Sequence, residues 1–411
     1  MGSTRHAAFV AVLLFASSCA SSSSSPSGGS AAPQPEASPS LVPGTHEAAR
    51  AAELRWSGYF WDVPDPLPPG EPGDLIRVGL RDGGSGVRVY RTMYHSTSVD
   101  GATPVAVTGT LWVPGGAAPA GGFPIMAWGP GFSGVGDDCA LSRHPDRDYQ
   151  SLLTRFVADG FVVASTDYEG HGTRYPYLDA IGESGTHALI DGARAAQDLL
   201  GPAASNRVVI AGHSLGGDMA SASQIFAPDY ADGLDIRGVV SMEPVGDYER
   251  LAAGAPNPDS VGVFLLMRVL RAMTAAYPEL RAEDVLSPRG LELLHTVHED
   301  GCQPFPDLDG VPQPDAQKVD LMSVHAWAAR FRSQTVPQAP YPVFYVMAED
   351  GNGLADNVRL TAERLCETAD HVLFKVYPGD HDNVVNVAYG DYVPWLVDRV
   401  TTDTPVDGCA F

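Results

Sequence analysis

The pentapeptide Gly212-His213-Ser214-Leu215-Gly216 is the only G-x-S-x-G segment in the chain. An apolar, β-branched run that begins at Arg207 precedes it, and small residues typical of a helix start follow it. Between a strand and a helix, such a serine occupies a sharp, strained turn that exposes its hydroxyl. The segment therefore predicts Ser214 as a nucleophile. It also predicts the N–H of Leu215, at a helix N-terminus, as an oxyanion donor.

A serine hydroxyl needs a general base, and the base needs an acid that orients it. In chains with this motif the order is serine, acid, histidine. Of the histidines after Ser214, only His381 directly follows a strand-like run and precedes the last helix. His371 begins the same run and would lie at the opposite edge. We therefore predict His381 as the base.

The acid is expected in the loop after the strand-like run Pro342–Met347, which reads Ala348-Glu-Asp-Gly-Asn-Gly353. Asp350 is the predicted acid, with Glu349 and Asp356 as alternatives. The non-catalytic interpretations are a solvated acidic loop for Glu349 and a helix N-cap for Asp356.

A second oxyanion donor is expected in the loop Gly129–Cys139, which follows the run Pro124–Trp128. Pro130 has no N–H, so the donor would be Gly131 or Phe132. The alternative is an ordinary glycine-rich turn.

Metal catalysis is a weaker hypothesis. The candidate ligands are Asp380, His381 and Asp382, or His295, His298 and Glu299. Neither group has a fixed helical spacing such as H-E-x-x-H. We expect no metal and no other cofactor.

Strand-like runs set the expected architecture. The first three, Leu75–Leu80, Val87–Tyr94 and Val105–Val113, are joined by short turns and predict antiparallel pairing. The later ones are Pro124–Trp128, Phe161–Thr166, Arg207–Ala211, Val239–Met242, Pro342–Met347 and Val372–Tyr377. Helical patterns alternate with them, including Asp148–Ala158, His187–Leu200 and Asp356–Cys366. The expected class is α/β, with a mostly parallel central sheet covered by helices on both faces.

The stretch between Ser241 and Pro342 has no convincing strand and is rich in helical pattern, which predicts an inserted helical cap at about residues 245–338. Within it, Val261–Ala276 is almost wholly apolar except for its arginines. A buried cap helix is the favoured interpretation, and an interfacial helix that contacts lipid is the alternative.

The amino-terminal segment predicts export. Arg5 and His6 precede an apolar run that ends in small residues, as in a signal peptide over residues 1–19, and Ser17-Ser18-Cys19 resembles the end of a bacterial lipobox. Lipidation of Cys19 would give a membrane tether, and ordinary cleavage is the alternative. The Ser-, Pro- and Gly-rich residues 20–45 are expected to form a flexible tether before the domain at 46–411.

Charge and cysteine content agree with export. The formal net charge of −24 argues against a nucleic-acid partner. Apart from Cys19 the chain has Cys139, Cys302, Cys366 and Cys409, with no C-x-x-C spacing. An even number in an oxidising compartment predicts two disulfides, for which the sequence allows three pairings.

Several separated segments resemble the secretory lipase family, of the fungal lipase A type, within the α/β-hydrolase superfamily. They are Gly131–Ala140 with its terminal Cys-Ala, Asp167–Thr173 followed by Tyr175-Pro-Tyr-Leu178, Asp191–Ala196, Gly212–Gly217, Tyr277–Leu280 and Leu365-Cys366. Together these segments cover most of residues 75–410. The chain departs from the family pattern in Trp128-Gly-Pro and in a shifted, glycine-rich acid loop.

The resemblance implies an α/β-hydrolase fold, an acyl-ester substrate and a triad of Ser214, Asp350 and His381. It also implies disulfides Cys139–Cys302 and Cys366–Cys409. The expected activity is that of a lipase or esterase, which hydrolyses carboxylic acyl esters such as acylglycerols through an acyl-enzyme. Two alternatives are a serine peptidase or amidase on the same scaffold, and a surface-binding protein without activity.

Overall fold

The computed structural model describes residues 44–411 except 83–85, 145–148, 255–259, 299–301, 303–310, 352, 370 and 403–407. The predicted signal peptide, Cys19 and nearly all of the tether lie outside the described residues.

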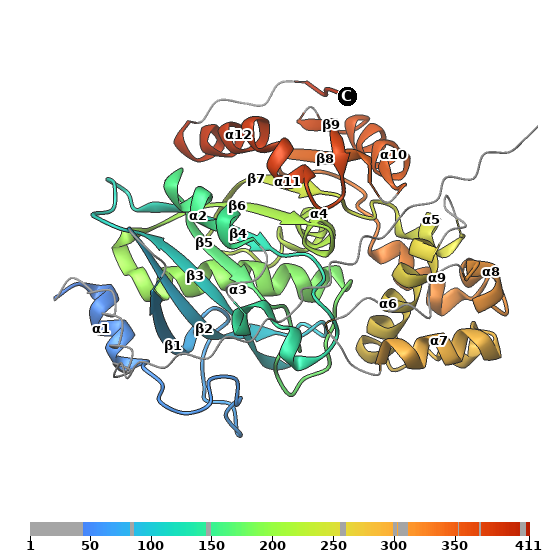
Figure 1. The fold of residues 1–411 in the computed structure, drawn as a ribbon, viewed down its shortest axis with the longest axis horizontal. Helices are drawn as coiled ribbons and strands as arrows, with labels where there is room; N and C mark the ends of the chain where they lie inside the picture. The colour runs from blue at the N-terminus through green and yellow to red at the C-terminus, as the bar shows by residue number, and fades with distance from the viewer. Residues whose placement is uncertain are drawn as a thin grey trace, which may run out of the picture. The chain divides into compact units, whose positions relative to one another are not determined.

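A nine-stranded sheet runs through the described domain, in the order β1-β2-β3-β5-β4-β6-β7-β8-β9 (Figure 1). Pairing is antiparallel from β1 to β3 and between β3 and β5, and parallel across all the remaining neighbours. The bounds are β1 Leu75–Asp82, β2 Val87–Thr97, β3 Pro104–Pro114, β4 Phe123–Gly129, β5 Val162–Thr166, β6 Ala204–His213, β7 Asp235–Met242, β8 Val343–Asp350 and β9 Val372–Asp380. Each predicted strand is present, and the mostly parallel sheet is confirmed.

Both faces of the sheet are covered, as expected for a parallel sheet. Alternate residues of β4 show this, since Ile125 and Ala127 belong to one buried cluster and Met126 and Trp128 to another. The first cluster includes helices α3 (Gly182–Leu200), α4 (Leu215–Phe226) and α10 (Ala355–Cys366). The second includes α2 (Gln150–Ala158), α11 (Val384–Val387) and α12 (Tyr389–Thr401). A further helix, α1 (His46–Glu53), precedes the sheet.

The segment predicted as an inserted cap has helices and no strand of the sheet in its described part, and these helices form a group beside the sheet (Figure 1). Its helices are α5 (Tyr248–Ala252), α6 (Ser260–Ala276), α7 (Pro288–His298), α8 (Gln313–Ala316) and α9 (His325–Ser333). The apolar helix α6 is a buried element, because Val263, Leu266 and Leu270 have no exposed surface. The interpretation as a buried cap helix is therefore correct, and the described side chains of α6 include no exposed large hydrophobic residue.

Two buried arginines anchor α6 to the sheet domain. Nε of Arg268 donates to Asp179 Oδ2 at 3.0 Å, and Arg271 pairs with the other carboxylate oxygen of Asp179. Asp179 lies on the segment that leads into α3. The apolar helix therefore docks through a charged contact as well as through its hydrophobic side.

Two disulfides confirm the pairing that the resemblance implied. Cys139, in the loop after β4, joins Cys302, and Cys366, at the end of α10, joins Cys409 near the carboxyl terminus. The second bond holds the final residues against β9, where Ala410 bridges to Leu373.

Removing the second disulfide should destabilise the domain measurably. The Cys366→Ser/Cys409→Ser variant opens a loop of sequence separation 43 and should lose about 2–4 kcal/mol of unfolding free energy. Urea unfolding of the variant and of the oxidised parent protein checks this. Equal midpoints for the two proteins would contradict it.

Candidate active site

Ser214 occupies a sharp turn between strand β6 and helix α4. Its backbone has φ 56° and ψ −117°, and α4 begins at the next residue, Leu215. Its N–H donates to the carbonyl of Met242, the last residue of β7, at 2.8 Å. A non-glycine residue at positive φ is strained and persists only where the surroundings enforce it. The strand–turn–helix setting predicted for the motif is therefore present.

Glycines surround this turn because three backbone segments touch there. A Cβ on Gly212 would lie 2.1 Å from the carbonyl oxygen of Gly216. A Cβ on Gly216 would lie 1.8 Å from the carbonyl oxygen of Gly129, at the end of β4. Both distances are far below van der Waals contact, so neither position can carry a side chain without moving backbone.

A cavity of about 320 Å³ contains both Ser214 and His381 in its lining. The loop after β4 contributes Gly131 and Phe132, and cap helix α6 contributes Phe264, Leu265 and Arg268. Tyr149, His213 and Asp382 complete the described lining. The predicted nucleophile, base and oxyanion loop thus meet at one cavity beneath the cap.

The carboxylate against His381 belongs to Glu243, which the sequence reasoning missed. Oε2 of Glu243 lies 3.0 Å from Nδ1 of His381, and its other oxygen accepts a hydrogen bond from the N–H of Ala348. The side chain is 1% exposed. Glu243 directly follows β7 and has a φ of 52°. A buried carboxylate is costly unless it is paired, and both of its oxygens are paired.

Asp350 is not in contact with His381, which corrects the predicted position of the acid. Asp350 is the last residue of β8, is exposed, and pairs in register with Asp380 of β9. The position beside the imidazole is filled, because a Cβ on Gly351 would lie 2.6 Å from Oε2 of Glu243. The loop after β8, which was predicted to supply the acid, instead packs against Glu243, which follows the neighbouring strand β7.

The two alternative acids do not reach the histidine either. Glu349 is exposed near the end of β8. Asp356 is exposed in the first turn of α10, whose N-cap is Leu354 rather than an aspartate.

The predicted oxyanion donors adjoin the serine on two sides. Leu215 is the first residue of α4, so its N–H is among those that have no acceptor within the helix. The N–H of Gly131 points to Tyr149 and donates to its hydroxyl at 3.2 Å. Phe132, one residue further, lines the same cavity.

Tyr149 and His213 connect the oxyanion loop to the segment that carries His381. Nε2 of His213 lies 2.7 Å from the carbonyl oxygen of His381, and Nδ1 lies 2.6 Å from the hydroxyl of Tyr149. Burial, with the nearby charge of His381, lowers the pKa of His213 to about 3. The ring is therefore neutral and has one N–H, which the carbonyl requires at Nε2. Tyr149 must then donate to Nδ1 and accept from Gly131.

Of the residues weighed as metal ligands, Glu299 and the side chain of His298 lie outside what the structure describes. Within the described part of the chain, no group of three or more His, Cys, Asp or Glu side chains could hold a metal ion. The carboxylate of Asp380 accepts a hydrogen bond from the N–H of Asn383 within its own turn.

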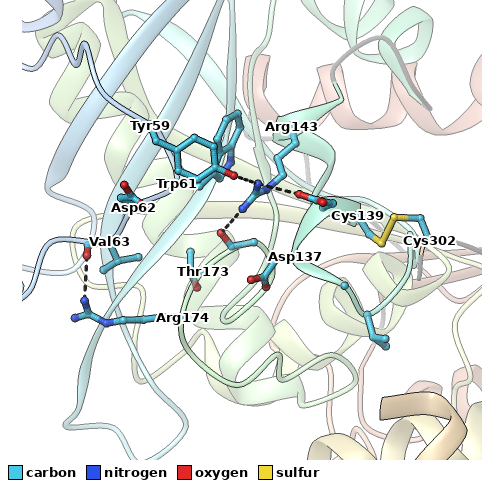
Figure 2. Close-up of a pocket in the computed structure, with 14 residues that line it drawn as sticks. Tyr59, Trp61, Asp62, Val63, Asp137, Cys139, Arg143, Thr173, Arg174 and Cys302 are labelled. Atoms are coloured by element: carbon cyan, nitrogen blue, oxygen red, sulfur yellow. Dashed lines mark hydrogen bonds and ion pairs between the residues drawn. A yellow bond between two sulfur atoms is a disulfide. The ribbon is translucent and has the colours of Figure 1, made fainter. Parts of the chain in front are cut away.

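A larger cavity, of about 910 Å³, shares no described lining residue with the cavity that contains Ser214 (Figure 2). Figure 2 shows Arg143 pointing toward Tyr59 and Trp61 in its wall, with Arg174 beside Val63. Its described lining includes neither a serine nor a histidine. The larger cavity is therefore not the one that contains the predicted nucleophile.

Protonation of His213 should make the fold lose stability in acid. The pKa of His213 falls from 6.5 to about 3 on folding, so between these pH values the unfolded chain binds the proton more readily than the folded one. The free energy of unfolding is therefore unaffected above pH 6.5 and decreases as pH falls toward 3. Between pH 7 and pH 5 the loss should be about 2 kcal/mol. The His213→Gln variant should lack this part of the pH dependence. Urea unfolding of both proteins at the two pH values tests this, and parallel losses would contradict it.

Comparisons with known proteins agree with this geometry. The family model described as secretory lipase matches residues 148–301. The structure of Candida antarctica lipase A in its closed state matches with a TM-score of 0.68 and 18% identity, covering 85% of this chain and 87% of that chain. Among proteins of curated function, none matches the sequence.

Two bacterial structures are also similar. A putative hydrolase from Legionella pneumophila matches with a TM-score of 0.65 and 16% identity, covering 80% of this chain and 92% of that chain. The rice cell wall degrading esterase LipA from Xanthomonas oryzae has a TM-score of 0.61 and 17% identity, with 80% and 97% covered. These likenesses establish the α/β-hydrolase fold. Over residues 148–301 the chain is also similar to the secretory lipase family.

Proposed function

We propose that the protein is an exported serine carboxylic ester hydrolase that acts through an acyl-enzyme. The observation that carries the proposal is the shared cavity of Ser214 and His381, with the imidazole held by the buried carboxylate of Glu243. Serine, acid and histidine follow one another along the chain in the order typical of this fold.

The reaction follows from these positions. The Ser214 hydroxyl attacks the ester carbonyl while Nε2 of His381 takes its proton, and the same proton then passes to the departing alcohol. Water attacks the acyl-enzyme in the second half, with His381 again as the base. Glu243 accepts from Nδ1–H, which fixes the tautomer that leaves Nε2 free to receive the proton.

The oxyanion is assigned to the N–H groups of Leu215 and Phe132. The N–H of Gly131 is engaged by Tyr149, so we assign Gly131 the role of a loop anchor. Donors fixed before the reaction stabilise the developing charge without reorganisation.

The volume of the cavity that contains Ser214 favours esters with short acyl groups over esters with long ones. This volume of about 320 Å³ lies at the lower end of the range for small-molecule sites. Helix α6 buries Val263, Leu266 and Leu270 in the domain, which supports a cap that does not face lipid. A second cavity of about 420 Å³ shares Gly131, Phe132 and Tyr149 with the first and offers space for the other half of the ester.

Export is consistent with the two disulfides, which form in oxidising compartments. Within its described part, the chain has no helix long and apolar enough to cross a bilayer. Lipidation of Cys19 and a tether over residues 20–45 remain part of the proposal.

Hydrolysis of p-nitrophenyl esters from acetate to palmitate tests the proposed activity. We expect turnover with an optimum at short chains, and a loss of at least ~10⁴-fold in kcat for Ser214→Ala, since the nucleophile is removed. The variant should remain folded by circular dichroism. Equal turnover by the parent protein and by Ser214→Ala would contradict the proposed nucleophile.

Matched substitutions test the acid. Glu243→Gln removes the negative charge and allows the wrong tautomer of His381, so kcat should fall by roughly 10²- to 10⁴-fold. Asp350→Asn, on an exposed strand end, should leave kcat within about threefold of the parent. A large loss of kcat in Asp350→Asn with little change in Glu243→Gln would instead identify Asp350 as the acid.

A further inference from the structure

Arg268 places a buried guanidinium group in the wall of the catalytic cavity. The residue is 4% exposed, lies on cap helix α6 and lines the same cavity as Ser214. Its guanidinium carbon lies 4.0 Å from the ring centre of Phe132, which is on the oxyanion loop. One side of the group is therefore stacked on the loop that adjoins the reacting carbonyl.

The hydrogen-bonding capacity of Arg268 is only partly used. Nε donates to Asp179, whereas the two Nη atoms have no hydrogen-bond partner among the described residues. Arg268 is part of the described lining of the cavity that holds Ser214. A planar guanidinium with free terminal N–H groups matches the geometry of a carboxylate.

The charges around Arg268 leave a positive excess. Asp179 is shared between Arg268 and Arg271, so two cations meet one carboxylate. Asp218, whose charge also acts on Arg268, is buried, and burial raises its pKa to about 7. Asp382 lines the cavity as well, but it is exposed and screened by water. An anion bound at Arg268 would compensate a buried positive charge.

The remaining wall restricts the size and polarity of that anion. Phe132, Phe264 and Leu265 are apolar neighbours of Arg268 in a cavity of about 320 Å³. A short hydrocarbon segment that ends in a carboxylate fits this combination, whereas a long neutral acyl chain would offer no acceptor to the Nη groups of Arg268.

From this geometry we propose that the enzyme prefers esters that carry a carboxylate close to the scissile carbonyl, such as half-esters of short dicarboxylic acids, and that Arg268 binds this carboxylate. The inference rests on the proposed ester hydrolysis and names its substrate class. A purely structural Arg268, acting only to dock α6, would affect charged and neutral esters equally.

The test compares two p-nitrophenyl esters whose second carboxyl group is ionised in one and methylated, hence neutral, in the other. They are mono-p-nitrophenyl adipate and its methyl ester, assayed with the parent protein and with Arg268→Met, with non-enzymatic hydrolysis subtracted. We expect the parent to favour the charged ester in kcat/KM. Arg268→Met should lose ~10- to 100-fold on that ester, mainly through KM, and much less on the neutral one.

Two further variants keep the test decisive. Arg268→Lys retains the charge and should recover part of the preference. Arg271→Met disturbs the same anchor to Asp179 but leaves Arg268 in place, so the ratio between the two esters should persist. A parent protein that hydrolyses the neutral ester as well as the charged one, or better, overturns the inference while the ester hydrolase stands. If neither ester is hydrolysed in a Ser214-dependent way, the inference and the proposed ester hydrolase are both overturned.

Discussion

The hydrogen bond between Glu243 and His381 connects the ends of two different strands, β7 and β9. Glu243 follows β7, the third strand from one edge of the sheet, and His381 follows β9 at that edge. Strand β8 lies between them and contributes the Ala348 N–H to the same carboxylate. Because a buried carboxylate must be paired, these three strand ends have to lie in one fixed register. The chemistry of Ser214 depends on that register, since it fixes the imidazole.

A second set of contacts holds the opposite side of the cavity. His213 binds the backbone of His381 and the hydroxyl of Tyr149, which in turn accepts from Gly131. The serine is therefore placed between a base held from two directions and a loop held by a tyrosine. Cap helix α6 closes the cavity with both apolar and cationic side chains, and its attachment to Asp179 couples the cap to the core.

Local patterns were enough to predict the strands, the turn at Ser214 and the position of His381. Each depends on a short run of residues: β-branched strands, glycines that permit close backbone contact, and a histidine just after a strand. The acid could not be assigned in this way. Glu243 also follows a strand directly, but choosing between two neighbouring strand ends requires knowing which loop closes over the other. That depends on tertiary packing around Gly351. Tyr149 and Arg268 were missed for the same reason, because their roles arise from contacts distant in sequence.

The most direct test of this account is a crystal structure of the protein after reaction with a short alkyl phosphonate ester. We predict phosphorus bonded to Oγ of Ser214, the phosphoryl oxygen facing the N–H of Leu215, and Nδ1 of His381 on the carboxylate of Glu243. A phosphonate on another residue, or an imidazole paired with Asp350, would contradict the account.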